Sequence, residues 1–406
     1  MKKILVLTES IEVNDSSGSK ANVALIKNLI KLKHSLKVYH LDRSRSKIEG
    51  VETFAIKRYK TSFYYWLVRF NTLFSKHGLN FNAFIEKKYG FSFSHFEDVE
   101  RFKKALAKED PEKYDIVFTL SKASSFRPHK TVLESPKWHF KWYAYVHDPY
   151  PMHAYPRPYD WVEPGHQKKR KFFIEVSKKA HKLMYPSLYL AEWMESYYGK
   201  LIEKRLLIPH QIDHSIQMGT KNRFFDALQF IILHAGNLMS ARKPQALVEA
   251  YKQLLENYPK LKSHSHLVFI GEESSFHSYF REQQKQLPQL KLSKGSIPFE
   301  EVLKLQADAS VNVILEAKGP ISPFLPGKFP HCVMAEKPIL LLGPYYSESR
   351  RLLGMENYPF WAEIDDQEKI YLTLEKLYLN WKSKQFTFKY EHVQNYLGLD
   401  HLRKVI

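Results

Sequence analysis

Residues 230–259, FIILHAGNLMSARKPQALVEAYKQLLENYP, join a short apolar run to a glycine turn and then to a helical pattern. The apolar run ends directly before Gly236, a residue type that suits a tight turn. Pro244 stands where the first turn of a helix tolerates proline, and apolar residues then recur every three or four positions. Because strand, turn and amphipathic helix are the repeating unit of a parallel sheet, we predict an α/β fold.

The same alternation of apolar runs and helical patterns continues through all 406 residues and restarts after residue 212. A chain of this length exceeds one hydrophobic core, so two domains are expected. We predict two doubly wound parallel-sheet domains, residues 1–212 and 213–385, followed by a C-terminal helical segment, residues 386–406, that can pack back on the first domain.

The composition is that of a folded protein without a membrane span. Hydrophobic residues make up 44% of the chain, which excludes a disordered protein. Cys332 is the only cysteine, so no intramolecular disulfide can form, and a cytoplasmic setting is favoured. The apolar run at residues 4–7 is too short for a signal peptide, and no segment approaches the roughly 20 apolar residues of a spanning helix.

The positive charge is concentrated in the first half of the chain. Residues 1–210 hold 38 Lys and Arg against 22 Asp and Glu, whereas the remainder holds 24 against 21. A one-sided excess suggests a surface that faces a polyanion, either anionic lipid or nucleic acid. The usual nucleic-acid modules are absent from the sequence, so nucleic acid ranks last. The charge then fits an anionic membrane surface, with the protein peripheral on the inner face of the cell membrane, or an anionic acceptor displayed there.

An aromatic and basic insertion, at about residues 56–105, interrupts the first predicted domain. A doubly wound fold needs only one helix at this place. The aromatic residues either fill a core beneath local helices, which is the favoured interpretation, or form a lipid-facing amphipathic helix. The basic run at residues 166–182 also has two interpretations: it is either a solvated helix face or a membrane-facing surface.

Two stretches of the second predicted domain have the chemistry of a phosphate site. A helix N-terminus offers free N–H groups, and a glycine corner allows a ligand to approach the backbone. Arg242 and Lys243 add two positive charges at the first stretch. In the second, residues 322–344, Ser322 and a Pro-Gly turn lead to Lys328 at a helix start. Two helix starts of this kind in one domain suggest a diphosphate site. The alternatives are a solvated turn at the first stretch and an exposed first-turn lysine at the second.

These two stretches resemble the signature regions of the nucleotide-sugar domain in retaining GT-B glycosyltransferases, particularly family 4. The likeness covers most of residues 205–345, while the first half of the chain matches mainly in the spacing of its predicted strands. The resemblance implies two Rossmann-like domains that face a central cleft. It also implies transfer from a UDP- or GDP-linked sugar to a glycan or lipid-linked acceptor, with retention and without a metal or other cofactor.

The resemblance also implies roles for individual residues. Arg242 and Lys328 would hold the donor diphosphate and stabilise it as it leaves. Ser296 and Ile297 would present backbone groups to the nucleobase. The other positions that the resemblance places around the donor are Gly18, Gly236, Asn237 and Ser322.

His147 and Asp148, in the stretch YVHDP, follow an apolar run and should lie at a strand end. Ligands of open parallel sheets bind beyond such carboxyl ends. We therefore predict that His147 touches the transferred sugar or the acceptor, although a single histidine is more often structural. An inverting enzyme would instead use His147 or Asp148 as a general base.

The sequence departs from the family pattern at the ribose contact. Many members carry two glutamates eight positions apart, where this chain has Pro323 and His331. Glu316, at the end of a predicted strand, is the nearest carboxylate that could replace them. The chain also has no Asp-x-Asp pair suited to a metal, so no metal is predicted. The alternatives are a sugar-nucleotide epimerase of the same fold and a non-catalytic protein that binds polyanions or membranes.

Overall fold

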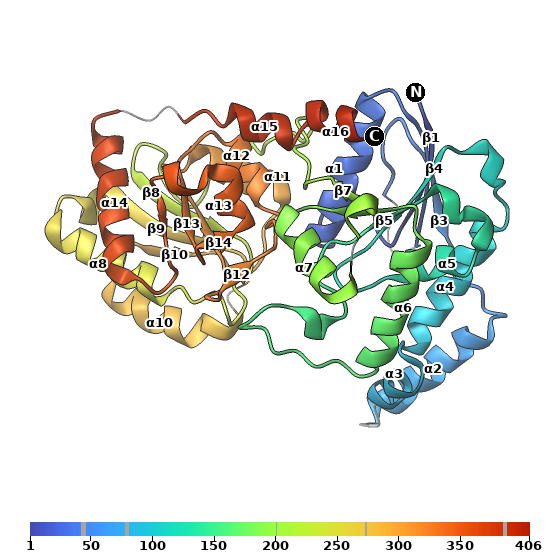
Figure 1. Ribbon diagram of the computed structural model, residues 1–406. Helices are drawn as coiled ribbons and strands as arrows, with labels where there is room; N and C mark the ends of the chain where they lie inside the picture. Colours follow the sequence, from blue (N-terminus) through green and yellow to red (C-terminus); the bar gives the residue numbers. More distant parts are fainter. Residues whose placement is uncertain (42–45, 78–80, 200, 273, 385–387) are drawn as a thin grey trace. The chain divides into compact units, whose positions relative to one another are not determined.

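The computed structural model describes residues 1–41, 46–77, 81–199, 201–272, 274–384 and 388–406 (Figure 1). The chain divides into two compact units. Unit 1 comprises residues 1–155, 159–211 and 399–406, and unit 2 comprises residues 156–158 and 212–398. Residues 78–80 of the predicted insertion and residues 386–387 of the predicted C-terminal segment lie outside the described residues.

Unit 1 contains a seven-stranded parallel sheet with the strand order β3-β2-β1-β4-β5-β6-β7. The chain builds outward from β1 in one direction and then in the other, so the order reverses between β1 and β4. The strands are β1 (Lys3–Thr8), β2 (Ser35–Leu41), β3 (Glu52–Ile56), β4 (Ile116–Leu120), β5 (Trp142–Tyr145), β6 (Lys182–Tyr185) and β7 (Arg205–Leu207).

Helices lie in the connections between these strands except between β2 and β3, where the described residues form no helix. The first of them begins where the Ser16 hydroxyl accepts a hydrogen bond from the Ser19 N–H, at 3.1 Å. The α-helices are α1 (Ser17–Lys31), α2 (Phe63–Lys76), α3 (Asn82–Tyr89), α4 (Phe93–Leu106), α5 (Arg127–Leu133), α6 (His166–Lys179), α7 (Leu188–Tyr198) and α16 (Leu399–Val405). Short 3-10 turns are η1 (Pro111–Lys113), η2 (Pro136–Lys141), η3 (Met152–Ala154) and η4 (Ile202–Lys204).

Unit 2 contains a six-stranded parallel sheet with the order β10-β9-β8-β11-β13-β15 and a two-stranded sheet of β12 and β14. Its strands are β8 (Phe230–Ala235), β9 (Ser265–Ile270), β10 (Leu290–Leu292), β11 (Val311–Leu315), β12 (Ile321–Ser322), β13 (Ile339–Leu342), β14 (Tyr346–Ser347) and β15 (Trp361–Ala362). The predicted α/β fold with two doubly wound parallel sheets is confirmed.

The helices of unit 2 cover both faces of its main sheet (Figure 1). They are α8 (Gln245–Asn257), α9 (Leu261–His264), α10 (His277–Gln286), α11 (Phe299–Asp308), α12 (Phe329–Met334), α13 (Glu348–Leu353), α14 (Gln367–Lys382) and α15 (Glu391–Tyr396), with 3-10 turns η5 (Ser274–Phe276) and η6 (Met355–Asn357). The strand and helix predicted from residues 230–259 are β8 and α8.

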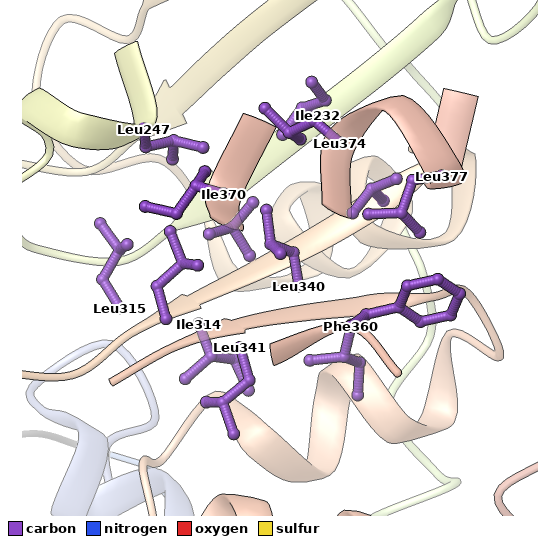
Figure 2. Close-up of a cluster of buried hydrophobic side chains, with 14 of the residues drawn as sticks. Ile232, Leu247, Ile314, Leu315, Leu340, Leu341, Phe360, Ile370, Leu374 and Leu377 are labelled. Carbon is purple, nitrogen blue, oxygen red and sulfur yellow. The ribbon is translucent and has the colours of Figure 1, made fainter. Parts of the chain in front are cut away.

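The core of unit 2 forms where α14 packs on the sheet (Figure 2). Ile370, Leu374 and Leu377 repeat at intervals of four and three residues, so they share one face of the helix. All three are fully buried, together with Leu340 of β13 and Ile232 of β8. Burial of each such side chain stabilises the fold by about 1.5–3 kcal/mol.

The insertion forms α2, α3 and α4, and the structure corrects the favoured interpretation of its aromatic residues. Tyr65 of α2 is buried, and α2 packs on α4. Phe63, Trp66 and Phe70 are instead 71%, 51% and 56% exposed. The prediction that these aromatic residues fill a core was therefore wrong, because α4 covers only the opposite side of α2.

Leu374→Ala should destabilise the protein through the cavity it leaves between α14 and the sheet, at a cost of about 2–5 kcal/mol in the free energy of unfolding. Leu372→Ala, on the exposed side of the same helix, should change it by less than about 0.5 kcal/mol. Urea denaturation of the two variants measures the difference. Equal effects would contradict the assigned core.

Candidate functional site

The candidate site of unit 2 lies where the strand order of its sheet reverses. The chain passes from β8 outward to β9 and β10, and then returns to β11 on the other side of β8. The loops that follow β8 and β11 therefore diverge, and such a point is where open parallel sheets bind ligands. Gly236 follows β8, and Glu316 follows β11.

Gly236 leaves room for the ammonium group of Lys328. A Cβ atom added at Gly236 would lie 2.7 Å from Lys328 Nζ, and the glycine has a φ of +142°. Both the space and the backbone conformation therefore require glycine. Its N–H donates to the carbonyl of Ile270 at the end of β9, at 2.7 Å, which fixes the turn.

His234 holds the other side of the Lys328 ammonium. Lys328 Nζ lies 2.7 Å from His234 Nε2, and the histidine side chain is fully buried in β8. Burial, with the nearby charges of Lys328 and Arg242, lowers the pKa of His234 well below its ordinary value. The neutral ring therefore accepts a hydrogen bond from Lys328. Sequence reasoning missed His234, although a polar residue inside the apolar run before Gly236 was a visible signal.

Lys328 is an electrostatically uncompensated cation. Burial, reinforced by the positive charge of Arg242, lowers its pKa to about 7. Among the described residues, no carboxylate lies within ion-pair distance of its ammonium. A desolvated cation beside a second cation favours an incoming anion, because the anion would restore the stability of the charged form.

Arg242 links the two loops electrostatically. Its charge helps to lower the pKa values of Lys328 and His234, and it opposes the rise that burial causes in the pKa of Glu316. Its Nε is buried and has no hydrogen-bond partner in the described part of the chain. The structure thus brings together three of the predicted site residues, Arg242, Lys328 and Glu316.

Serine hydroxyls surround Glu316, which is 3% exposed. The Ser349 hydroxyl donates to Glu316 Oε1 at 2.7 Å. Burial raises the pKa of the carboxyl group, while hydroxyls of Ser349, Ser347 and Ser322 oppose that shift. The predicted residue Ser322 is thereby placed beside Glu316, from β12.

The neighbouring strand ends are tied to the Gly236 turn. Asn237 Oδ1 accepts a hydrogen bond from the Glu272 N–H at 3.0 Å, so its side chain bridges the loops after β8 and β9. The Ser293 hydroxyl accepts from the Gly271 N–H at 2.9 Å and donates to the Gly295 carbonyl at 2.6 Å. The carboxyl ends of β8, β9 and β10 therefore form one connected edge.

The remaining predicted residues of unit 2 lie along this edge or next to it. Ser296 is exposed directly after Gly295, and Ile297 is half-buried against the apolar cluster that contains Leu305. The His331 ring, in α12, lies edge-on against Phe299 with a centroid distance of 4.7 Å.

Unit 1 places its predicted residues at the carboxyl edge of its own sheet. Gly18 is the second residue of α1, and a Cβ there would make only ordinary contacts, the nearest with Lys122 at 3.8 Å. His147 and Asp148 follow β5. These residues and the Arg242 cluster belong to different units.

His147 is engaged by polar neighbours within unit 1. Its Nε2 lies 2.8 Å from Asn22 Oδ1, and its Nδ1 lies 3.4 Å from His210 Nε2. Burial lowers the pKa of His147 well below its ordinary value, so the ring is neutral and donates to Asn22. Asn22 also donates to the Ser121 carbonyl at 3.2 Å, which anchors the ring to the end of β4. Sequence reasoning did not identify Asn22 or His210.

In the part of the chain that the structure describes, no group of three or more His, Cys, Asp or Glu side chains is arranged to hold a metal ion.

No protein-family model and no curated protein matches the sequence. Solved structures share the fold. They include OtsA in its apo form, with a TM-score of 0.63 and 10% identity over 99% of this chain and 97% of that one. A second is the E. coli trehalose-6-phosphate structure bound with UDP-2-fluoro glucose. It has a TM-score of 0.60 and 10% identity, and the match covers 99% of this chain and 97% of that one.

A third is the UDP-forming trehalose-phosphate synthase of Burkholderia xenovorans in complex with glucose-6-phosphate. It has a TM-score of 0.59 and 9% identity over 99% of this chain and 98% of that one. At such low identity the likeness establishes the fold, which is GT-B.

Replacing Lys328 should change how stability depends on pH. The pKa of Lys328 is about 7 in the folded state, against 10.5 for an ordinary lysine. Between these values the unfolded chain binds more protons, so this residue makes stability rise with pH. Lys328→Met should therefore be more stable than the wild type near pH 7, and the gap should narrow toward pH 10. Melting temperatures at several pH values test this; a pH-independent gap would contradict it.

Gly236→Ala should displace the Lys328 ammonium and weaken anion binding. The new methyl group would overlap Lys328 Nζ, whereas in the control Gly354→Ala nothing lies within 4 Å of the added Cβ. Both glycines have positive φ, so both variants carry a similar backbone penalty of about 1–3 kcal/mol. We expect at least about tenfold weaker binding of inorganic pyrophosphate at pH 7 for Gly236→Ala alone, measured by calorimetry. Equal binding by both variants would contradict the assigned contact.

Proposed function

We propose that the chain is a glycosyltransferase that uses a nucleotide-diphosphate sugar. Arg242 and Lys328, which share one electrostatic neighbourhood at the β8–β11 reversal, are the observation that carries the proposal. The donor is UDP- or GDP-linked, and a hexosyl unit passes to a glycan or lipid-linked acceptor. Transfer retains the anomeric configuration and uses no metal, as in family 4 of the retaining enzymes.

The chemistry of sugar transfer supports this assignment. The bond that breaks joins the sugar to a phosphate, so negative charge grows on the leaving diphosphate in the transition state. Fixed positive groups aimed at that charge lower the barrier. The planar guanidinium of Arg242 can hold two phosphate oxygens, while the Lys328 ammonium acts as a point charge. The carbohydrate carbon then develops positive character next to a bound anion.

Solved structures of the same fold guide the choice of ligands. One was determined with UDP-2-fluoro glucose and another with glucose-6-phosphate. These favour UDP-linked sugars as the first donors to test and a sugar as the acceptor. The positive charge of the first 210 residues further favours an acceptor that is anionic or displayed on an anionic membrane.

The ribose contact falls to Glu316 in this proposal. The Ser349 hydroxyl donates to Glu316 Oε1, and Oε2 is buried without a hydrogen bond from the described residues, so a ribose hydroxyl would supply the hydrogen bond that Oε2 lacks. Ser322, in β12, and His331, in α12, lie on either side of Lys328 along the chain. Ser296 and Ile297 would meet the base, and Gly236 and Asn237 would line the diphosphate.

In the sequence-based division, residues 1–212, which correspond to unit 1, would supply the acceptor site. Residues 213–385 would supply the donor site. Gly18 would face the donor, and His147 with Asp148 would meet the transferred sugar or the acceptor. In a retaining reaction the leaving phosphate takes the proton of the attacking hydroxyl, so the chain needs no strong base. The neutral ring of His147 then positions the sugar through hydrogen bonds and does not remove a proton.

A nucleotide panel tests the proposal directly. One nucleoside diphosphate or its sugar should raise the melting temperature, because ligands that bind only the folded state stabilise it. Arg242→Ala and Lys328→Ala should each weaken its binding by about ten- to a hundredfold, since charge-assisted hydrogen bonds contribute about 1.5–3 kcal/mol. The exposed neighbour Lys243 provides the matched control, and Lys243→Ala should bind as the wild type does.

The panel also separates the competing functions. Release of nucleoside diphosphate with formation of a glycosylated product supports the transferase, whereas a changed sugar on an intact nucleotide would identify an epimerase. A folded protein that binds no nucleotide or nucleotide sugar would overturn the donor site and with it the proposed function.

A further inference from the structure

One side of α2 exposes a continuous row of large apolar residues. Phe63, Trp66, Phe70, Leu73 and Phe74 are all exposed, by 44% to 71%. Their spacing of three, four, three and one residues places them on one side of the helix. Single exposed apolar residues are common, but a row along about three helical turns is not explained by the packing of unit 1.

The neighbouring helix extends this surface. Figure 1 shows α3 beside α2, and the two are joined by a hydrogen bond of 2.8 Å from Asn71 to Asn82. The rings of Phe74 and Phe81 lie 5.8 Å apart, and Phe84 of α3 is 65% exposed. We define the α2–α3 face as these exposed apolar residues: Phe63, Trp66, Phe70, Leu73, Phe74, Phe81 and Phe84.

Cations accompany the α2–α3 face. Residues 57–90 contain seven Lys and Arg but only one carboxylate, Glu86. Arg69 and Lys76 on α2, with Lys87 and Lys88 on α3, are exposed. Among the described residues, none of these four forms an ion pair with a carboxylate. The segment thus combines aromatic side chains with uncompensated positive charge.

We propose that the α2–α3 face docks on an anionic lipid bilayer, with its aromatic residues in the interfacial region and its cations against the headgroups. Aromatic and apolar side chains on one side of a helix, bordered by Lys and Arg, are the features of helices that lie in a membrane surface. Anionic headgroups supply the charge that the segment lacks. No helix among the described residues is long and apolar enough to span a bilayer, so this mode of contact is superficial.

Charge distinguishes a bilayer from a second copy of the chain. Two α2–α3 faces brought together would place the four exposed cations of one copy, Arg69, Lys76, Lys87 and Lys88, against the same four of the other, with no paired carboxylate among the described residues to compensate them. An anionic bilayer instead attracts each cation and offers an apolar layer to the rings. Docking goes beyond the proposed sugar transfer and does not depend on it, because binding to vesicles requires no nucleotide.

Vesicle co-sedimentation of the full chain tests the docking surface. The wild type should bind vesicles that contain 30% phosphatidylglycerol in phosphatidylcholine, and it should bind pure phosphatidylcholine at least tenfold more weakly. Phe70→Ser combined with Leu73→Ser should reduce partition to the anionic vesicles by at least about tenfold, because two apolar side chains no longer enter the interface. Lys87→Glu combined with Lys88→Glu should reduce it similarly.

A matched control uses exposed apolar residues of unit 1 that lie elsewhere. Phe140 and Ile202 are 87% and 59% exposed, so Phe140→Ser combined with Ile202→Ser removes comparable apolar surface. This variant should bind vesicles as the wild type does. Trp66 provides a direct probe: brominated lipids should quench part of the wild-type tryptophan fluorescence, and Trp66→Phe should remove that part while the protein still binds.

Several outcomes would overturn the inference. These are unchanged vesicle binding by the Phe70 and Leu73 variant, equal loss in the Phe140 and Ile202 control, or no binding by folded wild type. A concentration-dependent dimer that this variant dissociates, seen by analytical ultracentrifugation, would assign the face to a second copy instead. Nucleotide binding is measured separately, so failure of docking leaves the donor-site proposal standing.

Discussion

The Lys328 ammonium contacts His234 and lies in the space that a side chain at Gly236 would fill, and this is the constraint around which the candidate site is built. It exists only because Gly236 lacks a side chain. It also carries an electrostatic cost, because burial and the charge of Arg242 lower the pKa of the lysine to about 7. A cation held in such surroundings creates a positive potential that attracts an anion. A bound diphosphate would stabilise the charged form of Lys328 and raise its pKa.

That cost is offset elsewhere in the same unit. The face of α14 that carries Ile370, Leu374 and Leu377 is fully buried against the sheet, and the ends of β8, β9 and β10 are joined by hydrogen bonds through Asn237 and Ser293. These contacts hold the strand ends in place independently of any ligand. The site can therefore keep its charges unpaired without loss of its geometry, as preorganised binding of a developing charge requires.

The sequence predicted what depends on local pattern. Strand and helix periods identified both parallel sheets. The turn chemistry singled out Arg242 and Lys328, and the structure places them within electrostatic reach of each other. His234 escaped notice because the strand around it is otherwise apolar. The Ser349 contact with Glu316 spans 33 residues and arises only when the loops after β11 and β13 meet. The exposure of Phe63, Trp66 and Phe70 could not be predicted, because composition does not reveal which side of α2 is covered by α4.

The cations of the proposed donor site and those of the α2–α3 face differ in their solvation, and this difference separates their proposed roles. Lys328 is desolvated, so its charge acts strongly at short range and is poorly screened by salt. Lys87 and Lys88 are exposed, and charges in water are screened within about 8 Å at physiological ionic strength. Salt should therefore weaken attraction to a membrane while it leaves the diphosphate contact largely intact. The exposed cations suit a reversible approach to a surface, whereas the desolvated Lys328 beside Arg242 suits a single anion held in a fixed geometry.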